Sequence, residues 1–228
     1  MSGKRILYIN PGEKDELLDQ QIKEFLTPYQ SAATAGIDVV SMPLTPRHLE
    51  YQCYHALVLP EILREVVKGE EAGYDGVEVP LFGGDVPHYT KVAKAIRDNG
   101  LKCTTCTVMP DEEHNPISAD PKHRQGAVDY LKWAIDCNAA LGSEVLCGPM
   151  YQPLGGKFFT GKGPTPEEKE RAAEVLGKAG AFAKGANLQI ALECLNRFEC
   201  YFLNTLNDAA ALAKRINHPN VGIMYDSF

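Results

Sequence analysis

The chain has 228 residues, of which 44% are hydrophobic and 23% charged, a composition typical of a soluble globular protein. Its net charge of −7 argues against nucleic acid as a partner, because nucleic-acid binding needs a basic surface. No apolar run approaches the ~18 residues of a membrane-spanning helix, and the N-terminus leads into a predicted strand without a secretory hydrophobic region. Seven cysteines without framework spacing indicate reduced thiols, so we expect a cytoplasmic protein.

Apolar runs alternate with helical patterns along the whole chain. The predicted strands are residues 5–10, 37–42, 76–80, 101–108, 144–147, 188–193 and 221–226. The predicted helices are residues 16–35, 57–68, 88–99, 122–141, 166–185 and 207–216. Such alternation indicates a parallel sheet with right-handed crossovers. No Pro/Ser-rich linker interrupts it, so we expect one α/β domain over residues 1–228.

The first third of the chain carries a resemblance of its own. Its residues 6–11 (ILYINP), 51–57 (YQCYHAL) and 60–63 (PEIL) resemble those of the Asp/Glu/hydantoin racemases, which have a flavodoxin-like fold and a cofactor-free mechanism with two thiols. The first of those thiols should follow the strand at residues 76–80, where this chain has Leu81. The resemblance therefore implies a racemase-like scaffold over residues 1–72 without racemase chemistry.

Three motifs within the chain have weaker functional interpretations. Residues 156–163 are similar to a phosphate-binding loop, but Gly163 stands where a Ser or Thr would hold Mg²⁺. Cys103 and Cys106 lie on one predicted strand and point to opposite faces, which favours packing over a redox pair. The acidic run at 111–114 is typical of a solvated loop.

Two later strands end on carboxylates. Glu193 ends the strand at 188–193 and Asp226 ends the strand at 221–226. Because the carboxyl ends of parallel strands meet at one edge of a sheet, we expect both side chains to emerge on the same face. Two such carboxylates suit a divalent cation with oxygen ligands. The alternative interpretation is an exposed strand end with ordinary loop charges.

Two more residues are candidates for substrate binding. Glu78, in the strand at 76–80, is placed much as Glu193 is, and we expect it to face the same cavity. The alternative is a polar side chain satisfied inside a barrel mouth. Gly148 opens a Gly/Pro-rich loop after the strand at 144–147, and its backbone freedom suits a substrate loop.

The polar strand ends also carry a family resemblance. Residues 191–199 (ALECLNRFE), 202–205 (FLNT) and 224–228 (MYDSF) resemble the ketose 3-epimerases of the D-tagatose/D-psicose type, which belong to the xylose-isomerase-like TIM barrels. The resemblance extends over residues 73–228. It implies a parallel (β/α) TIM-barrel-like fold, and the racemase-like segment implies an incomplete or chimeric barrel with a flavodoxin-like start.

The epimerase resemblance also implies a mechanism. Similar enzymes bind one Mn²⁺, Co²⁺ or Mg²⁺ and move the C3 proton of a ketose between two glutamates through an enediolate. Matched by motif, Glu193 is the first of these glutamates and a metal ligand, Asp226 is a second ligand, and Glu199 contacts the substrate.

Further family residues, a ligand His and a second Glu among them, would follow Phe228. We therefore expect a weakly held metal and negligible conversion of D-fructose or D-tagatose. An uncovered strand edge would favour a homo-oligomer. Two other functional hypotheses stay open. One is a non-catalytic fusion or scaffold protein, and the weaker one is a racemase.

Overall fold

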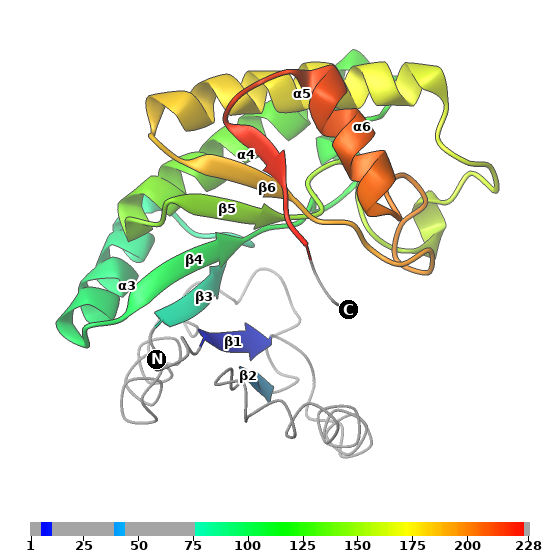
Figure 1. The fold of residues 1–228 in the computed structure, drawn as a ribbon. Coiled ribbons are helices and arrows are strands. Elements are labelled where there is room, and N and C mark those ends of the chain that lie inside the picture. Colours follow the sequence, from blue (N-terminus) through cyan, green and yellow to red (C-terminus); the bar gives the residue numbers. More distant parts are fainter. Residues whose placement is uncertain (1–5, 11–38, 44–75, 226–228) are drawn as a thin grey trace. The chain divides into compact units, whose positions relative to one another are not determined.

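The computed structural model of the chain describes residues 6–10, 39–43 and 76–225 (Figure 1). The chain divides into two compact units, Met1–Thr104 and Thr105–Phe228, and the division falls within one strand. Each unit is described by itself. The predicted helices at 16–35 and 57–68 and most of the racemase-like segment lie outside the described residues, as does Asp226.

The described residues of the first unit form three complete parallel strands and one helix. Strand β1 (Ile6–Asn10) pairs with β2 (Val39–Pro43) on one side and with β3 (Gly76–Pro80) on the other. Helix α3 (Val86–Asp98) follows β3, and β4 (Lys102–Cys106) begins in this unit. The carboxylate of Asp85 accepts a hydrogen bond from the His88 backbone N–H at 2.8 Å, which caps α3. All three strands were predicted from the apolar runs.

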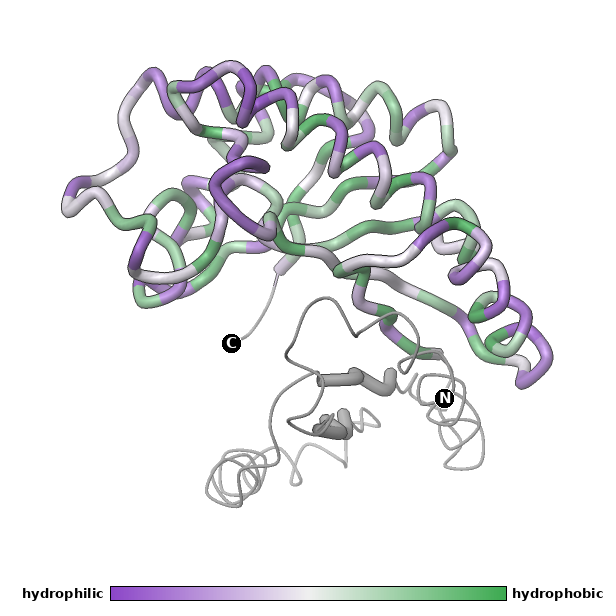
Figure 2. Tube along the Cα trace, turned by 180° about the vertical axis from the view of Figure 1, so that it is seen from behind, coloured by the Kyte–Doolittle hydropathy of each residue, from purple (hydrophilic) through white to green (hydrophobic). Residues whose placement is uncertain are grey.

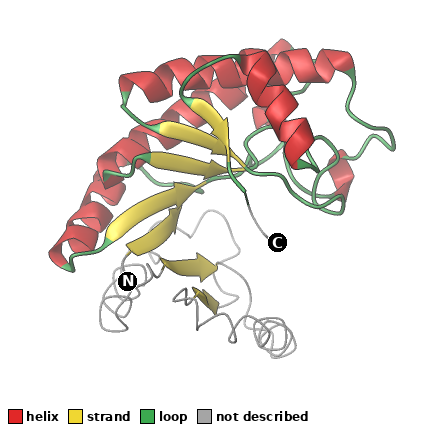
Figure 3. Cartoon of the chain, viewed as in Figure 1, coloured by secondary structure: helices red, strands yellow, loops and turns green. Residues whose placement is uncertain are grey.

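The second unit is a parallel sheet in which β4, β5 and β6 are each followed by a helix. The end of β4 pairs with β5 (Val145–Gly148), β5 with β6 (Gln189–Leu192), and β6 with β7 (Val221–Ile223). Helices α4 (Pro121–Leu141), α5 (Pro166–Gly185) and α6 (Leu206–Ile216) form a layer on one side of these strands (Figure 3). Two 3₁₀ turns, η3 (Glu112–His114) and η4 (Gly156–Phe158), interrupt the loops and were not predicted.

Local signals set the helix boundaries of this unit. Thr165 caps α5 through a capping box with Glu168, and Pro166 follows in the first turn. Asp120 caps the start of α4, and Gly142 ends that helix in the left-handed conformation with φ 73°. The predicted helix boundaries are confirmed to within two residues for α3, α4, α5 and α6.

The core of the second unit lies between its strands and helices. Apolar residues run along the strands, while the helices alternate between apolar and polar positions (Figure 2). Buried side chains from both layers meet there: Leu131, Ile135, Leu146, Leu176, Ile190 and Leu192. Burying side chains of this size is the main stabilising contribution to such a layered fold. None of the helices in the described part of the chain is long and apolar enough to cross a membrane.

Candidate active site at the strand ends

Glu193 is the first residue beyond β6, and the backbone ladder holds it in place. Its N–H donates to the carbonyl of Gly148 at 3.1 Å, and the Met224 N–H donates to the Leu192 carbonyl at 3.0 Å. The β5–β6 and β6–β7 pairings therefore continue to the ends of the strands. Glu193 is half-buried, and its backbone is fixed at the carboxyl edge of the sheet while part of the residue is open to solvent.

Gly148 ends β5 next to Glu193 in a conformation that suits glycine. Its φ is +128°, and a Cβ added there would lie 2.1 Å from the carbonyl oxygen of Thr107. The structure thus gives Gly148 a packing role, because no larger residue fits so close to the neighbouring backbone. Its predicted contact with substrate stays a prediction.

Glu199 lies in the loop between β6 and α6, in a turn built by Asn196. The side-chain carbonyl of Asn196 accepts from the Phe198 N–H at 2.9 Å, and its amide nitrogen donates to the Glu199 carboxylate. The N–H groups of Glu199 and Cys200 both donate to the Asn196 carbonyl, each at 3.2 Å. The Asn–Arg–Phe–Glu motif is therefore a self-capped turn that presents an exposed carboxylate.

Two buried residues after β5 support this turn, and the sequence predicted this supporting role for neither of them. Tyr151 stacks on Phe202 with ring centroids 5.7 Å apart, and its hydroxyl donates to the Leu203 carbonyl at 3.3 Å. Gln152 is 1% exposed and accepts from the N–H groups of Tyr201 and Phe202. The sequence holds one sign of this role, the amide side chain of Gln152 between Tyr151 and Pro153.

Tyr151 lies close enough to Glu193 for that carboxylate to affect the pKa of its phenol. Burial raises the pKa of the Tyr151 phenol far above its ordinary value. The Cys200 thiol, which lies 3.5 Å from the phenol oxygen, raises it further, and the charges of Cys194 and Glu193 add smaller amounts. The phenol therefore stays protonated, and it can only donate or accept hydrogen bonds at neutral pH.

Glu78 belongs to the first unit, where it is half-buried on β3. Its carboxylate accepts a hydrogen bond from the Thr104 hydroxyl at 3.2 Å. Burial, together with repulsion from Glu78, raises the pKa of the Cys103 thiol to about 12. The hydrogen bond to Thr104 matches the alternative of a satisfied polar side chain, and convergence of Glu78 with Glu193 stays a prediction.

The described residues provide one carboxylate, Glu193, of the predicted metal pair. No group of three or more His, Cys, Asp or Glu side chains that could hold a metal occurs among residues 76–225. The acidic run after β4 is used locally: Asp111 caps η3 and contacts the His114 imidazole at 2.7 Å, and Glu112 accepts from Asn115. The oxygen donors Glu193 and Asp226 suit Mg²⁺ or Mn²⁺ by their chemistry.

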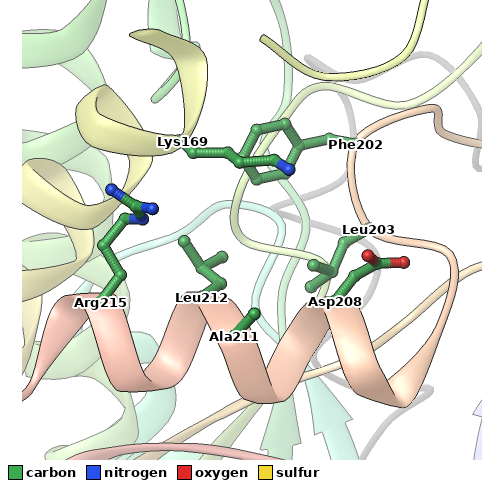
Figure 4. Close-up of a pocket in the computed structure, with 7 residues that line it drawn as sticks. All are labelled: Lys169, Phe202, Leu203, Asp208, Ala211, Leu212 and Arg215. Atoms are coloured by element: carbon green, nitrogen blue, oxygen red, sulfur yellow. The ribbon is translucent and has the colours of Figure 1, made fainter. Parts of the chain in front are cut away.

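A separate small pocket lies between α5, α6 and the loop before α6 (Figure 4). Its volume is about 100 Å³, below the ~300–1,000 Å³ of ordinary ligand pockets. The lining residues are Lys169, Phe202, Leu203, Asp208, Ala211, Leu212 and Arg215. Because none of the predicted site residues lines it, this pocket is not the candidate active site.

The family model of the xylose isomerase-like TIM barrel matches residues 66–228. The chain belongs to this family. The predicted parallel TIM-barrel-like fold is thereby confirmed, and the match covers both Glu78 and the strand ends with Glu193 and Asp226. The racemase resemblance of residues 1–72 and a chimeric origin stay predictions.

Curated relatives of the chain are sugar epimerases. It is 29% identical to a ketose 3-epimerase of Arthrobacter globiformis over 163 residues, which cover 72% of this chain and 55% of that enzyme. It is 28% identical to a D-psicose 3-epimerase of Ruminiclostridium cellulolyticum, over 72% of this chain and 56% of that enzyme. The chain thus spans about half the length of the curated relatives it matches.

Solved structures of sugar epimerases share the fold. A D-psicose 3-epimerase with D-tagatose from Clostridium cellulolyticum H10 matches with a TM-score of 0.64 and 23% identity, over 71% of this chain and 56% of that one. An L-ribulose 3-epimerase matches with a TM-score of 0.64 and 27% identity, over 71% of this chain and 53% of that one. The predicted kinship with ketose 3-epimerases is confirmed.

Proposed function

We propose that this protein acts on a ketose sugar and moves the proton at C3, with Glu193 as the acid–base group. One observation carries the proposal. Glu193 is fixed at the carboxyl end of β6, where enzymes of this fold place their chemistry, in a chain whose relatives are ketose 3-epimerases. The half-buried carboxylate can reach a substrate bound at the edge of the sheet.

A divalent cation completes the proposed chemistry. Glu193 and Asp226 would hold Mn²⁺, Co²⁺ or Mg²⁺, which when bound polarises the C2 carbonyl and O3 of the ketose and so acidifies the C3 proton. The Glu193 carboxylate takes that proton from one face of the sugar, the electron pair of the broken C–H bond passes into an enediolate, and the protonated Glu193 returns a proton to C3 after exchange with solvent. The backbone hydrogen bond to Gly148 keeps Glu193 at the end of β6.

Three further residues are proposed to bind the sugar. Glu199 offers an exposed carboxylate that Asn196 orients, and such a group accepts hydrogen bonds from sugar hydroxyls. Gly148, which has no side chain, is proposed as a second contact at the carboxyl end of β5. Glu78 is proposed as a third contact, from the first unit.

We also propose a cellular location, an oligomeric state and an assignment of the first segment. None of the six cysteines between residues 76 and 225 forms a disulfide, which supports a reducing, cytoplasmic environment. A homo-oligomer is proposed on the exposed side chains Ile223 and Tyr225 of β7 and the residues after it, which are 40% and 74% exposed. Residues 1–72 are proposed to be a racemase-like segment joined to the epimerase-like barrel.

Hydrogen exchange at C3 tests the proposal more sensitively than full conversion does. The protein is incubated in D₂O with Mn²⁺ and D-fructose or D-tagatose, and deuterium at C3 is followed by NMR. We expect Mn²⁺-dependent exchange that Glu193→Gln lowers about 100-fold or more, because a positioned general base contributes 10²–10⁴-fold. Mn²⁺ binding, measured by electron paramagnetic resonance, should also weaken in Glu193→Gln.

Glu144→Gln is the matched control. Glu144 is an exposed glutamate at the opposite end of β5, so its substitution should change neither exchange nor Mn²⁺ binding. Equal exchange rates in the Glu193→Gln variant and the unsubstituted protein would place the acid–base group elsewhere. A folded protein that neither binds Mn²⁺ nor exchanges C3 would instead support the non-catalytic alternative.

A further inference from the structure

The loop of residues 194–204 is folded around the side chain of one buried glutamine. The Gln152 carbonyl oxygen accepts from the Phe202 N–H at 2.9 Å and from the Tyr201 N–H at 3.2 Å. The Gln152 amide nitrogen donates to the Pro153 carbonyl at 3.0 Å, which fixes the orientation of the side chain. With 1% exposure, Gln152 makes these bonds out of reach of bulk water.

Other contacts join the same two loops. The Gly155 N–H donates to the Glu199 carbonyl at 2.9 Å, so the backbone of Glu199 itself is bonded to the loop after β5. Tyr151 packs under Phe202, and the Tyr201 hydroxyl donates to Glu168 at the start of α5 at 2.7 Å. Loop 194–204 is thus anchored to the loop after β5 and to α5 from Glu199, at the end of its Asn196 turn, to Phe202.

The two N–H groups explain why an amide is needed at this place. Successive backbone donors at Tyr201 and Phe202 both point at one site, and a single carbonyl oxygen with two lone pairs satisfies them. An apolar side chain would leave both donors unsatisfied, which is unfavourable for groups out of reach of water. The loop would then have to open to let water reach these donors.

We propose that Gln152 is a positioning residue, whose amide holds loop 194–204 in the conformation that presents Glu199 to the substrate. This proposal rests on the proposed function only for its effect on sugar binding. The effect on the loop follows from the hydrogen bonds alone. Glu193 precedes the loop and is held by the Gly148 carbonyl, so its metal-binding role does not depend on Gln152.

Trypsin provides a readout that does not require activity. Arg197 and Phe198 lie at the exposed tip of the loop, and cleavage between them reports its opening. We expect Gln152→Met, which keeps the length of the side chain but has no acceptor, to be cut there at least tenfold faster. Gln152→Glu keeps acceptors for both N–H groups and should restore part of the protection. Cleavage is followed by mass spectrometry on the full chain.

The matched control removes a different buried amide from the same unit. Asn138 on α4 is fully buried and donates to Thr105 and to the Val145 carbonyl, far along the chain from the loop. Asn138→Leu should lower stability without selectively speeding cleavage at Arg197. In the C3 exchange assay, Gln152→Met should raise the KM for the ketose about tenfold and leave kcat within about threefold and Mn²⁺ binding unchanged.

Each outcome decides a separate question. Unchanged cleavage at Arg197 in a folded Gln152→Met variant, with native Trp133 fluorescence, would overturn the positioning role. If that variant does not fold, Gln152→Asn takes its place, because the shorter amide withdraws the acceptor from both N–H groups, and unchanged cleavage would again overturn the proposal. Absent C3 exchange in the unsubstituted protein would refute the proposed function and leave the cleavage result to decide the role of Gln152.

Discussion

Gly148 combines two roles that glycine can serve at the end of a strand. The residue leaves β5 with a positive φ, and its Cα faces the Thr107 carbonyl so closely that a Cβ would lie 2.1 Å from that oxygen. Glu193 donates its N–H to the carbonyl of the same glycine at 3.1 Å. Displacing Gly148 would therefore displace the proposed acid–base residue as well.

Gly148→Ala should be strongly destabilising. The added methyl group meets backbone atoms that cannot move without breaking the β4–β5 pairing, and alanine also disfavours the positive φ. We expect a loss of about 3 kcal/mol or more in the free energy of unfolding, measured by urea titration of Trp133 fluorescence. Gly156→Ala is the control, since a Cβ there meets nothing within 4 Å and φ is not positive. Equal losses in the two variants would refute the steric argument.

At the scale of elements, signals near in sequence were enough to locate the four described helices, α3 to α6. Thr165 and Glu168 lie within four positions and form one capping box at the start of α5, with Pro166 between them in the first turn. The polar loops were not predictable in this way. Gln152 bonds Tyr201 across 49 residues, and Tyr201 bonds Glu168 across 33.

The candidate site shows the same difference between features that nearby residues predict and features that depend on long-range contacts. The strand-end position of Glu193 follows from an apolar run that stops at an acid, a pattern visible in the sequence alone. The support that Tyr151 and Gln152 give to the loop carrying Glu199 depends on which loops the fold brings together, and no local pattern encodes that pairing. Residue types that satisfy a distant backbone group look ordinary in sequence, because the need for them arises only after folding.

The capping box of α5 should contribute measurably to stability. The Thr165 hydroxyl accepts from the Glu168 N–H at 3.2 Å, and the Glu168 carboxylate accepts from the Thr165 N–H at 2.7 Å. We expect Thr165→Ala to lower the free energy of unfolding by about 1 kcal/mol, while Thr165→Ser, which keeps the hydroxyl, stays within about 0.5 kcal/mol of the original. Thermal unfolding followed by circular dichroism measures both. An alanine variant as stable as the serine variant would contradict the assignment.

At the scale of the whole molecule, the predicted site residues fall in both units of the chain. Glu78 lies in the unit of residues 1–104, and Gly148, Glu193 and Glu199 lie in the unit of residues 105–228. The sequence has a single tryptophan, Trp133, and it lies on α4 of the second unit. Its fluorescence therefore reports on the unfolding of the unit that contains the proposed acid–base residue.

The second unit should lose stability at alkaline pH. Burial raises the pKa of Tyr151 and of Tyr201 above the ordinary value of 10.0, and the hydrogen bond from Tyr201 to Glu168 adds to the second shift. Below pH 10 the folded and unfolded chains both keep these protons, so the two tyrosines add no pH dependence. Above pH 10 the unfolded chain releases them and the folded chain holds them, so the free energy of unfolding falls as pH rises.

Urea titrations of Trp133 fluorescence at pH 8, 9, 10 and 10.5 measure this loss. The pKa of Cys194 is also raised, by burial first and then by Asp208, so the decline should begin near pH 9, where an unfolded thiol ionises. Tyr201→Phe removes one of the groups and should make the decline above pH 10 shallower. Tyr225→Phe, at a tyrosine that is 74% exposed, is the matched control and should leave the slope unchanged. Parallel curves for Tyr201→Phe and the original protein would mean that the Tyr201 phenol ionises equally in both states, against its burial and its bond to Glu168.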